Sequence, residues 1–232
     1  MNERLQELLK NITVQYIKTA QPVSSKAIAE AGNFDLSSAT IRNEMAELEN
    51  SGYIYHPHTS AGRVPTEKGY QYFVDNFLKP TLPLKRHQEA LVKHFGGNRF
   101  DHQVVKSAAK FLAEISSQAV FVAFANNDFF YTGISNLFSQ PEFERRQLIY
   151  DLSKTIDHLD RVIAKIFPEV DDEVLVSVGS KNPFARDCSS VMAKYRNNQE
   201  EGLIGIIGPM RMDYQNNFSL ISFSQQLINN IK

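Results

Sequence analysis

The residues with the clearest capacity for chemistry share one face of a short predicted helix near the start of the chain. That face consists of small, polar or cationic side chains, namely Ser38, Ala39, Thr40, Arg42 and Asn43. Arginine can pair with guanine, and asparagine with adenine, through two hydrogen bonds each. We therefore predict that Thr40, Arg42 and Asn43 contact base edges of DNA, and that Ser38 and Lys26 contact phosphate.

A second group of polar side chains follows in a stretch rich in turn-forming residues, 56–62. The candidates for contact with phosphate oxygens or with a minor groove are His58, Thr59, Ser60, Gly62 and Arg63. Gly62 is expected to let the backbone approach DNA closely. His56 and His58 flank a proline, but two ligands fall short of the three or four that a zinc site needs, so we predict no metal.

Other motifs favour structural roles over catalysis. In the loop 208–213, Asp213 is expected to cap the last helix and Arg211 to pair with a nearby carboxylate or carbonyl, although a glycine loop before a helix can also bind an anion. There is no Gly-x-Ser-x-Gly elbow, phosphate-binding loop or His-Glu-x-x-His pair. Cys188 is interpreted as a buried free thiol. The sequence therefore predicts a protein that is not an enzyme and has no cofactor.

The candidate DNA-contacting residues would be positioned by three helices and a hairpin. An apolar stripe predicts a helix over 5–16, Ser24 can cap a second helix over 25–31, and Ser37 can cap a third that runs to about residue 50. Two short strands, 53–55 and 63–65, follow at once, and Thr66 can cap a further helix. A helix followed directly by a two-stranded hairpin predicts a winged helix-turn-helix.

The remaining chain predicts a second domain of α+β class. Prolines at 80 and 83 mark a linker, which carries a helix over 84–95. The expected elements after it are a helix with its stripe at Val104, Ala108, Phe111, Leu112 and Ile115, strands 119–125 and 129–137 around a tight 126–128 turn, helical structure over 142–166, strands 174–178, 188–195 and 202–208, and a last helix with its stripe at Leu220, Phe223, Leu227 and Ile231. We predict a winged-helix domain over 1–79, a linker over 80–101 and a regulatory domain over 102–232, with an antiparallel sheet and flanking helices.

Composition is that of an ordinary globular protein, with 42% hydrophobic and 22% charged residues among 232. No apolar run approaches the roughly 18 residues of a membrane span, and the polar start argues against a signal peptide. A single cysteine suits the reducing cytoplasm. The net charge is −1, and residues 1–79 carry eight Lys/Arg against nine Asp/Glu, which counts against strong non-specific binding to nucleic acid.

The chain has three longer segments of distinctive sequence, Ser38–Met45, Pro57–Tyr70 and Gly205–Tyr214, and shorter ones at Ser135–Leu137, Gln140–Phe143 and Asp187–Ser189. These segments resemble one bacterial family, the heat-inducible transcription repressors HrcA. They span nearly the whole chain, and the segment from Pro57 to Tyr70 is long and highly specific.

This resemblance implies a homodimeric repressor that binds an inverted-repeat operator of chaperone operons on double-stranded DNA. It also implies a GAF-like fold for the regulatory domain, inactivation by heat, and a chaperonin partner that maintains the active form. Longer family members insert a dimerising region at about the position of 125–128, and that region looks absent here. Dimerisation would then use another surface, such as the helix after Pro83 or the last helix.

Two alternatives remain open. The regulatory domain could hold a small-molecule ligand that controls DNA binding, since GAF-like folds often do. In a different class, the winged helix could bind a protein partner instead of DNA, which the near-neutral charge would suit.

Overall fold

The computed structural model describes residues 1–232 except 33, 35, 59, 60, 96–99, 126, 127, 145, 198, 199 and 232. Within it the chain forms two compact units, Met1–Leu78 and Lys79–Lys232. The helix predicted inside a linker over 80–101 packs on helices of the second unit and lies within that unit. No helix in the described part of the chain is long and apolar enough to cross a membrane.

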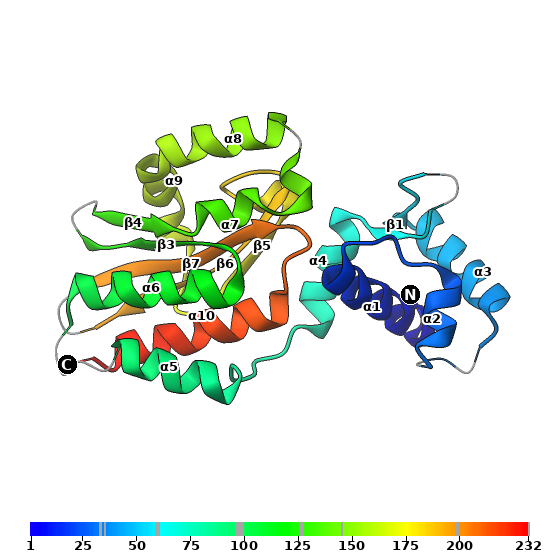
Figure 1. Ribbon diagram of the computed structural model, residues 1–232, viewed down its shortest axis with the longest axis horizontal. Coiled ribbons are helices and arrows are strands. Elements are labelled where there is room, and N and C mark those ends of the chain that lie inside the picture. Colours follow the sequence, from blue (N-terminus) through cyan, green and yellow to red (C-terminus); the bar gives the residue numbers. More distant parts are fainter. Residues whose placement is uncertain are drawn as a thin grey trace. The chain divides into compact units, whose positions relative to one another are not determined.

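In its described residues, the first unit contains four helices and one small hairpin (Figure 1). In chain order these are α1 (Glu3–Thr19), α2 (Ser25–Glu30), α3 (Ser38–Asn50), β1 (Ile54–Tyr55), β2 (Val64–Pro65) and α4 (Glu67–Phe77). Each helix begins at a residue whose side-chain oxygen accepts a backbone N–H of the first turn: Asn2, Ser24, Ser37 and Thr66. The predicted caps at Ser24, Ser37 and Thr66 are confirmed.

The core of this unit joins the first and third helices. Leu8, Leu9 and Ile12 of α1 are fully buried and belong to one cluster with Ile41 and Leu48 of α3. The apolar stripe predicted for the first helix is therefore confirmed. Because these residues fix the rotation of α3 about its axis, they also decide which of its side chains are left on the surface.

The second unit is built on a five-stranded antiparallel sheet with strand order β4-β3-β7-β6-β5. Its strands are β3 (Ala119–Ala123), β4 (Phe129–Thr132), β5 (Leu175–Val178), β6 (Cys188–Arg196) and β7 (Glu201–Pro209). In the long central pair, Val191 lies opposite Ile206 and Cys188 opposite Pro209. The three central strands are almost completely buried because helices cover both faces of the sheet.

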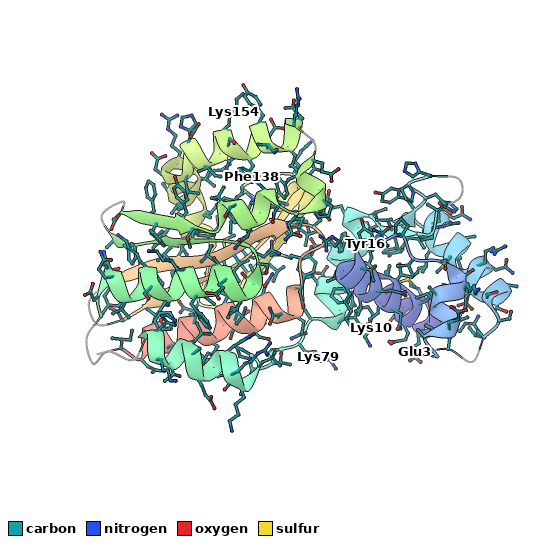
Figure 2. All side chains as sticks on the ribbon, in the orientation of Figure 1. Glu3, Lys10, Tyr16, Lys79, Phe138 and Lys154 are labelled. Carbon is teal, nitrogen blue, oxygen red and sulfur yellow. The ribbon has the colours of Figure 1, made fainter. Side chains whose placement is uncertain are left out.

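The helices of this unit are distributed over the two faces. They are α5 (Lys85–Phe95), α6 (His102–Ser116), α7 (Ile134–Phe138), α8 (Arg146–Asp157), α9 (Leu159–Ile166) and α10 (Tyr214–Asn229), with short 3-10 turns at Pro141–Glu144, Phe167–Glu169 and Gly179–Lys181. In Figure 1, α6 and α10 lie along one face, with α5 against them, and α7, α8 and α9 lie on the other. Side chains of α8 and α9 pack with Phe121, Met192 and Ile207 of the sheet. Lys154 of α8 is exposed, and Phe138 of α7 packs at the edge of that cluster (Figure 2). The α+β class and the antiparallel sheet are confirmed.

The predicted strand 129–137 is wrong beyond Thr132. The chain turns at Gly133, which has φ +74°, and residues Ile134–Phe138 form α7. A Cβ at Gly133 would lie 2.4 Å from the carbonyl oxygen of Gln118. The turn therefore packs so closely against the residue before β3 that no side chain fits at position 133. Part of the predicted 126–128 turn lies outside the described residues.

The predicted stripes of two helices are confirmed only in part, since Ala108 and Leu112 of α6 and Leu220 of α10 are buried as predicted. In α6 the most deeply buried residues include Val105 and Ala109, whereas Val104 and Phe111 are only half-buried. In α10 the deeply buried side includes Asn217 and Ser224. Since α10 is enclosed between the sheet and α5, polar as well as apolar side chains are buried along it.

Candidate nucleic-acid interface

The first half of α3 presents its predicted polar face to solvent. Ser38, Ala39, Arg42 and Asn43 are exposed and Thr40 is half-buried. The hydroxyl of Ser37 accepts the backbone N–H of Thr40 at 3.1 Å and so fixes where the helix begins. Neither Arg42 nor Asn43 makes a side-chain hydrogen bond or ion pair with another described residue. Both groups are therefore available to a ligand.

The carboxylates of α3 are largely compensated within the first unit. Glu44 is 8% exposed and forms an ion pair with Arg4 of α1, Nε to Oε1 at 2.5 Å. Glu49 forms an ion pair with Arg63, at 2.7 Å, and its Oε1 lies within hydrogen-bond distance of Nδ1 of His56, at 3.1 Å. Only Glu47 of the three is exposed. The first unit has no excess of basic residues, but Glu44 and Glu49 are paired within it and Arg42 is exposed. The polar face of α3 therefore carries a cationic group.

The hairpin is anchored to the segment before α2. The backbone of Arg63 pairs with that of Val23 through two N–H···O bonds, each of 2.8 Å. A Cβ on Gly62 would lie 2.4 Å from the carbonyl carbon and oxygen of Val23. Glycine at 62 therefore allows the hairpin to approach the protein's own backbone, a reason different from the approach to DNA that the sequence predicted.

The other hairpin candidates differ in their availability. His58 is exposed, whereas the side chain of Arg63 is only 12% exposed because it turns back to Glu49. Thr59 and Ser60 lie outside the described residues. On α2, Lys26 is exposed and its ammonium lies 3.6 Å from a carboxylate oxygen of Glu30. No group of three or more potential metal ligands occurs in the described ranges.

A cavity of about 330 Å³ lies where α2, α3 and the hairpin meet. Its lining combines three basic side chains with hydroxyl, small and apolar residues: Val23, Ser24, Ser25, Arg42, Met45, His56, Ala61, Gly62 and Arg63. The cavity is continuous with the predicted reading face, because Arg42 belongs to both. The sequence did not reveal the cavity, since α2, α3 and the hairpin come together only in the folded unit.

The loop 208–213 of the second unit has a structural role. Nε of Arg211 donates to Oε1 of Glu142 at 2.6 Å, and the guanidinium also donates to Oε1 of Gln140 at 3.0 Å. The carboxylate of Asp213 accepts the backbone N–H of Asn216 at 3.1 Å and caps α10. Both predicted structural roles are confirmed. Cys188 is a fully buried free thiol, as predicted, and burial raises its pKa to about 12.

Comparisons with known proteins identify a family to which the chain is similar. A family model described as the HrcA protein C-terminal domain matches residues 122–217. The heat-inducible transcription repressor HrcA of Natranaerobius thermophilus is 27% identical over 328 aligned positions, which cover 96% of this chain and 94% of that protein. That of Thermoanaerobacter sp. (strain X514) is 26% identical over 340 positions, with 100% and 97% covered. That of Caldanaerobacter subterraneus is 44% identical over 121 positions, with 50% and 34% covered.

The lengths of these alignments and one solved structure add to the comparison. The alignments over 328 and 340 positions exceed the 232 residues of this chain, so those relatives have residues at positions where this chain has none. A crystal structure of a hypothetical protein matches 100% of both chains with a TM-score of 0.77 at 17% identity, which shows a shared fold. The family model and the named relatives together show that the chain is similar, over nearly its whole length, to the HrcA heat-inducible transcription repressors.

Proposed function

We propose that the first unit is a winged helix-turn-helix through which this repressor reads double-stranded DNA. The observation that carries the proposal is the state of α3: its first half is exposed with Arg42 and Asn43 uncommitted among the described residues, while Glu44 and Glu49 are paired inside the unit. Helix-turn-helix proteins place this half of the recognition helix in the major groove. The chain is accordingly a regulator and not an enzyme.

Each candidate residue has a definite part in this proposal. Thr40, Arg42 and Asn43 contact base edges, where a bidentate pair is worth about 1–3 kcal/mol of discrimination. Contacts to the sugar-phosphate backbone come from Lys26, Ser38, Ala39, His58, Thr59, Ser60, Gly62 and Arg63. Backbone contacts set the register on the duplex, and base contacts set the sequence preference.

The operator we propose is an inverted repeat before chaperone genes, bound by a homodimer and released on heating. Two readers on such a site must lie about 34–36 Å apart, or a multiple of that. Three apolar residues are exposed on α5 and on the segment just before it: Leu82, Leu84 and Val92. They favour this part of the chain as the dimer surface. The second unit then acts as a GAF-like regulatory domain, with a chaperonin as the partner that maintains activity. Sedimentation of Leu84→Glu/Val92→Glu beside the wild type tests the dimer surface; an unchanged dimer would exclude it.

Fluorescence anisotropy tests DNA reading directly. The protein is titrated into an inverted-repeat chaperone operator and into a scrambled duplex, each at two salt concentrations. We expect tight binding to the operator that weakens steeply with salt through counterion release. Arg42→Ala and Asn43→Ala should each remove most of the preference, by about 5- to 150-fold. Binding that does not distinguish the two duplexes would contradict sequence-specific reading, and the absence of salt-sensitive binding to either duplex would instead support a protein partner for the first unit.

A cavity in the second unit favours a second candidate function, control by a small molecule. It has a volume of about 420 Å³, within the range of ligand pockets. Its wall is apolar at Phe124, Phe129, Ile163 and Phe167, and Asp128, Asp160 and Glu201 bring carboxylates to it. An amine with an apolar body would suit this lining. Thermal denaturation with a panel of metabolites tests it, because a ligand that binds the folded state raises the melting temperature.

A further inference from the structure

One carboxylate of α3, that of Glu49, is shared by the two basic side chains at the base of the hairpin. Its Oε2 lies 2.7 Å from a terminal nitrogen of Arg63, and its Oε1 lies 3.1 Å from Nδ1 of His56. The side chain of Glu49 is 31% exposed and that of Arg63 is 12% exposed. Glu49 therefore compensates a cation that is mostly withdrawn from water.

Both basic partners of Glu49 line the 330 Å³ cavity beside α3. Nε of Arg63 is buried and has no hydrogen-bond partner in the described structure, although a guanidinium has five N–H donors to satisfy. Arg42 lines the same cavity from the reading face, and the hydroxyl of Ser24 there is already used to cap α2. The cavity therefore has basic groups and an unused N–H donor, and no carboxylate is among its described lining residues.

We propose that this cavity is a phosphate-binding subsite for the DNA backbone and that Glu49 is the intramolecular competitor of that phosphate. The inference rests on the proposed function and adds to it a site and a means of limiting affinity. In the free protein the Glu49 carboxylate pairs with Arg63 and His56. On the duplex, a backbone phosphate takes a place beside His56 and Arg63, where an Arg–phosphate pair is a strong charge-assisted contact.

The competition has consequences of opposite sign for stability and affinity. Removal of the Glu49 charge leaves Arg63 poorly compensated in the free protein, which destabilises the first unit. The same removal takes away a negative charge that would repel the phosphate and leaves Arg63 to pair with it. A residue that merely supports the hairpin would behave otherwise, since its loss would reduce stability and affinity together.

The chain offers a matched control on the same helix. Glu47 is exposed and lines a different hollow, with Met1, Leu5 and Lys68. Glu47→Gln changes the net charge by the same amount as Glu49→Gln, so it reports the general electrostatic effect without the local one. The double variant Glu49→Gln/Arg63→Gln reports whether any gain depends on Arg63.

The experiment measures duplex affinity against salt for the full chain and its variants, on operator and scrambled DNA. Relative to Glu47→Gln, we expect Glu49→Gln to bind both duplexes about three- to fivefold more tightly. The slope of log K against log salt should steepen by about 0.9, as for one additional phosphate neutralised. The melting temperature of the free variant should fall, and the gain in affinity should vanish in the double variant.

Other outcomes overturn the inference in distinguishable ways. Equal effects of the two single variants, or weaker binding by Glu49→Gln, would overturn the competition while the proposed DNA reading stands. No binding of the wild type to any duplex would remove the proposed function itself. Inorganic phosphate forms a separate arm: if it raises the melting temperature of Glu49→Gln while duplex affinity stays unchanged, the cavity binds free phosphate and not DNA.

Discussion

Replacement of Gly62 by alanine should separate the hairpin from the segment before α2, to which Val23 belongs. The added Cβ would meet three backbone atoms, the carbonyl carbon and oxygen of Val23 at 2.4 Å and the carbonyl carbon of Pro22 at 2.7 Å. Backbone atoms cannot move aside as the end of a flexible side chain can. The contact must therefore open, and the two 2.8 Å hydrogen bonds between Val23 and Arg63 must lengthen or break.

The magnitude follows from these contacts. Each backbone hydrogen bond contributes about 1 kcal/mol net, and overpacking alone costs about 1–3 kcal/mol. We expect a local loss of about 2–3 kcal/mol at this junction, part of the overlap being relieved as the bonds open. Gly52→Ala is the control: nothing lies within 4 Å of its added Cβ, and its φ of +75° predicts a cost of only about 1 kcal/mol.

Native-state amide hydrogen exchange is the suitable assay, because it reports each unit separately. The amides of Val23 and Arg63 both donate in the bridge, so Gly62→Ala should lower their protection by about 30- to 150-fold. Amides of α6 in the second unit should keep theirs. Unchanged protection at Val23 and Arg63 in Gly62→Ala, or an equal loss in Gly52→Ala, would refute the steric reasoning.

The remaining predictions concern the second unit and the core of the first. Burial raises the pKa of the Cys188 thiol from 9.0 to about 12, so between these pH values the folded state holds a proton that the unfolded state releases. The free energy of unfolding, measured with urea, should therefore fall as pH rises from 9 to 12. The fall should be less steep in Cys188→Ala. Arg211→Lys loses the paired contacts with Glu142 and Gln140 and should lower the stability of the second unit by about 1–3 kcal/mol in thermal unfolding; an unchanged melting temperature would contradict that. Asp213→Ala removes the cap of α10 and should cost about 1 kcal/mol, most of it restored by Asp213→Asn, in the same assay. Arg4→Met leaves the 8%-exposed Glu44 carboxylate without its ion pair and should destabilise the first unit, whereas the double change with Glu44→Gln should recover much of the loss.

Local chemistry explains why much of the first unit could be predicted from the sequence. Ser24, Ser37 and Thr66 each cap the helix that immediately follows, and such caps act within three residues. The stripe with Ile41 and Leu48 repeats at helical spacing, so the opposite face followed directly. The exposure of Arg42 and Asn43 is a consequence of that same rotation.

Long-range contacts explain what the sequence did not reveal. Arg63 was predicted to face DNA, but its pairing with Glu49 depends on how the hairpin folds back against α3. Asn217 and Ser224 of α10 are buried because that helix is enclosed on more than one side. Gly133 was a local signal that could have ended the strand at Thr132, since a left-handed glycine stops an extended run.

The central claim, that α3 and the hairpin read DNA, is tested most directly by amide chemical-shift mapping. An isotope-labelled protein is titrated with the operator duplex and, separately, with the scrambled duplex. The account predicts operator-specific shifts concentrated at Ser38–Asn43 and around the hairpin base from His56 to Arg63, with smaller shifts at the same sites on scrambled DNA. Shifts confined to the second unit, or an identical pattern with both duplexes, would contradict it.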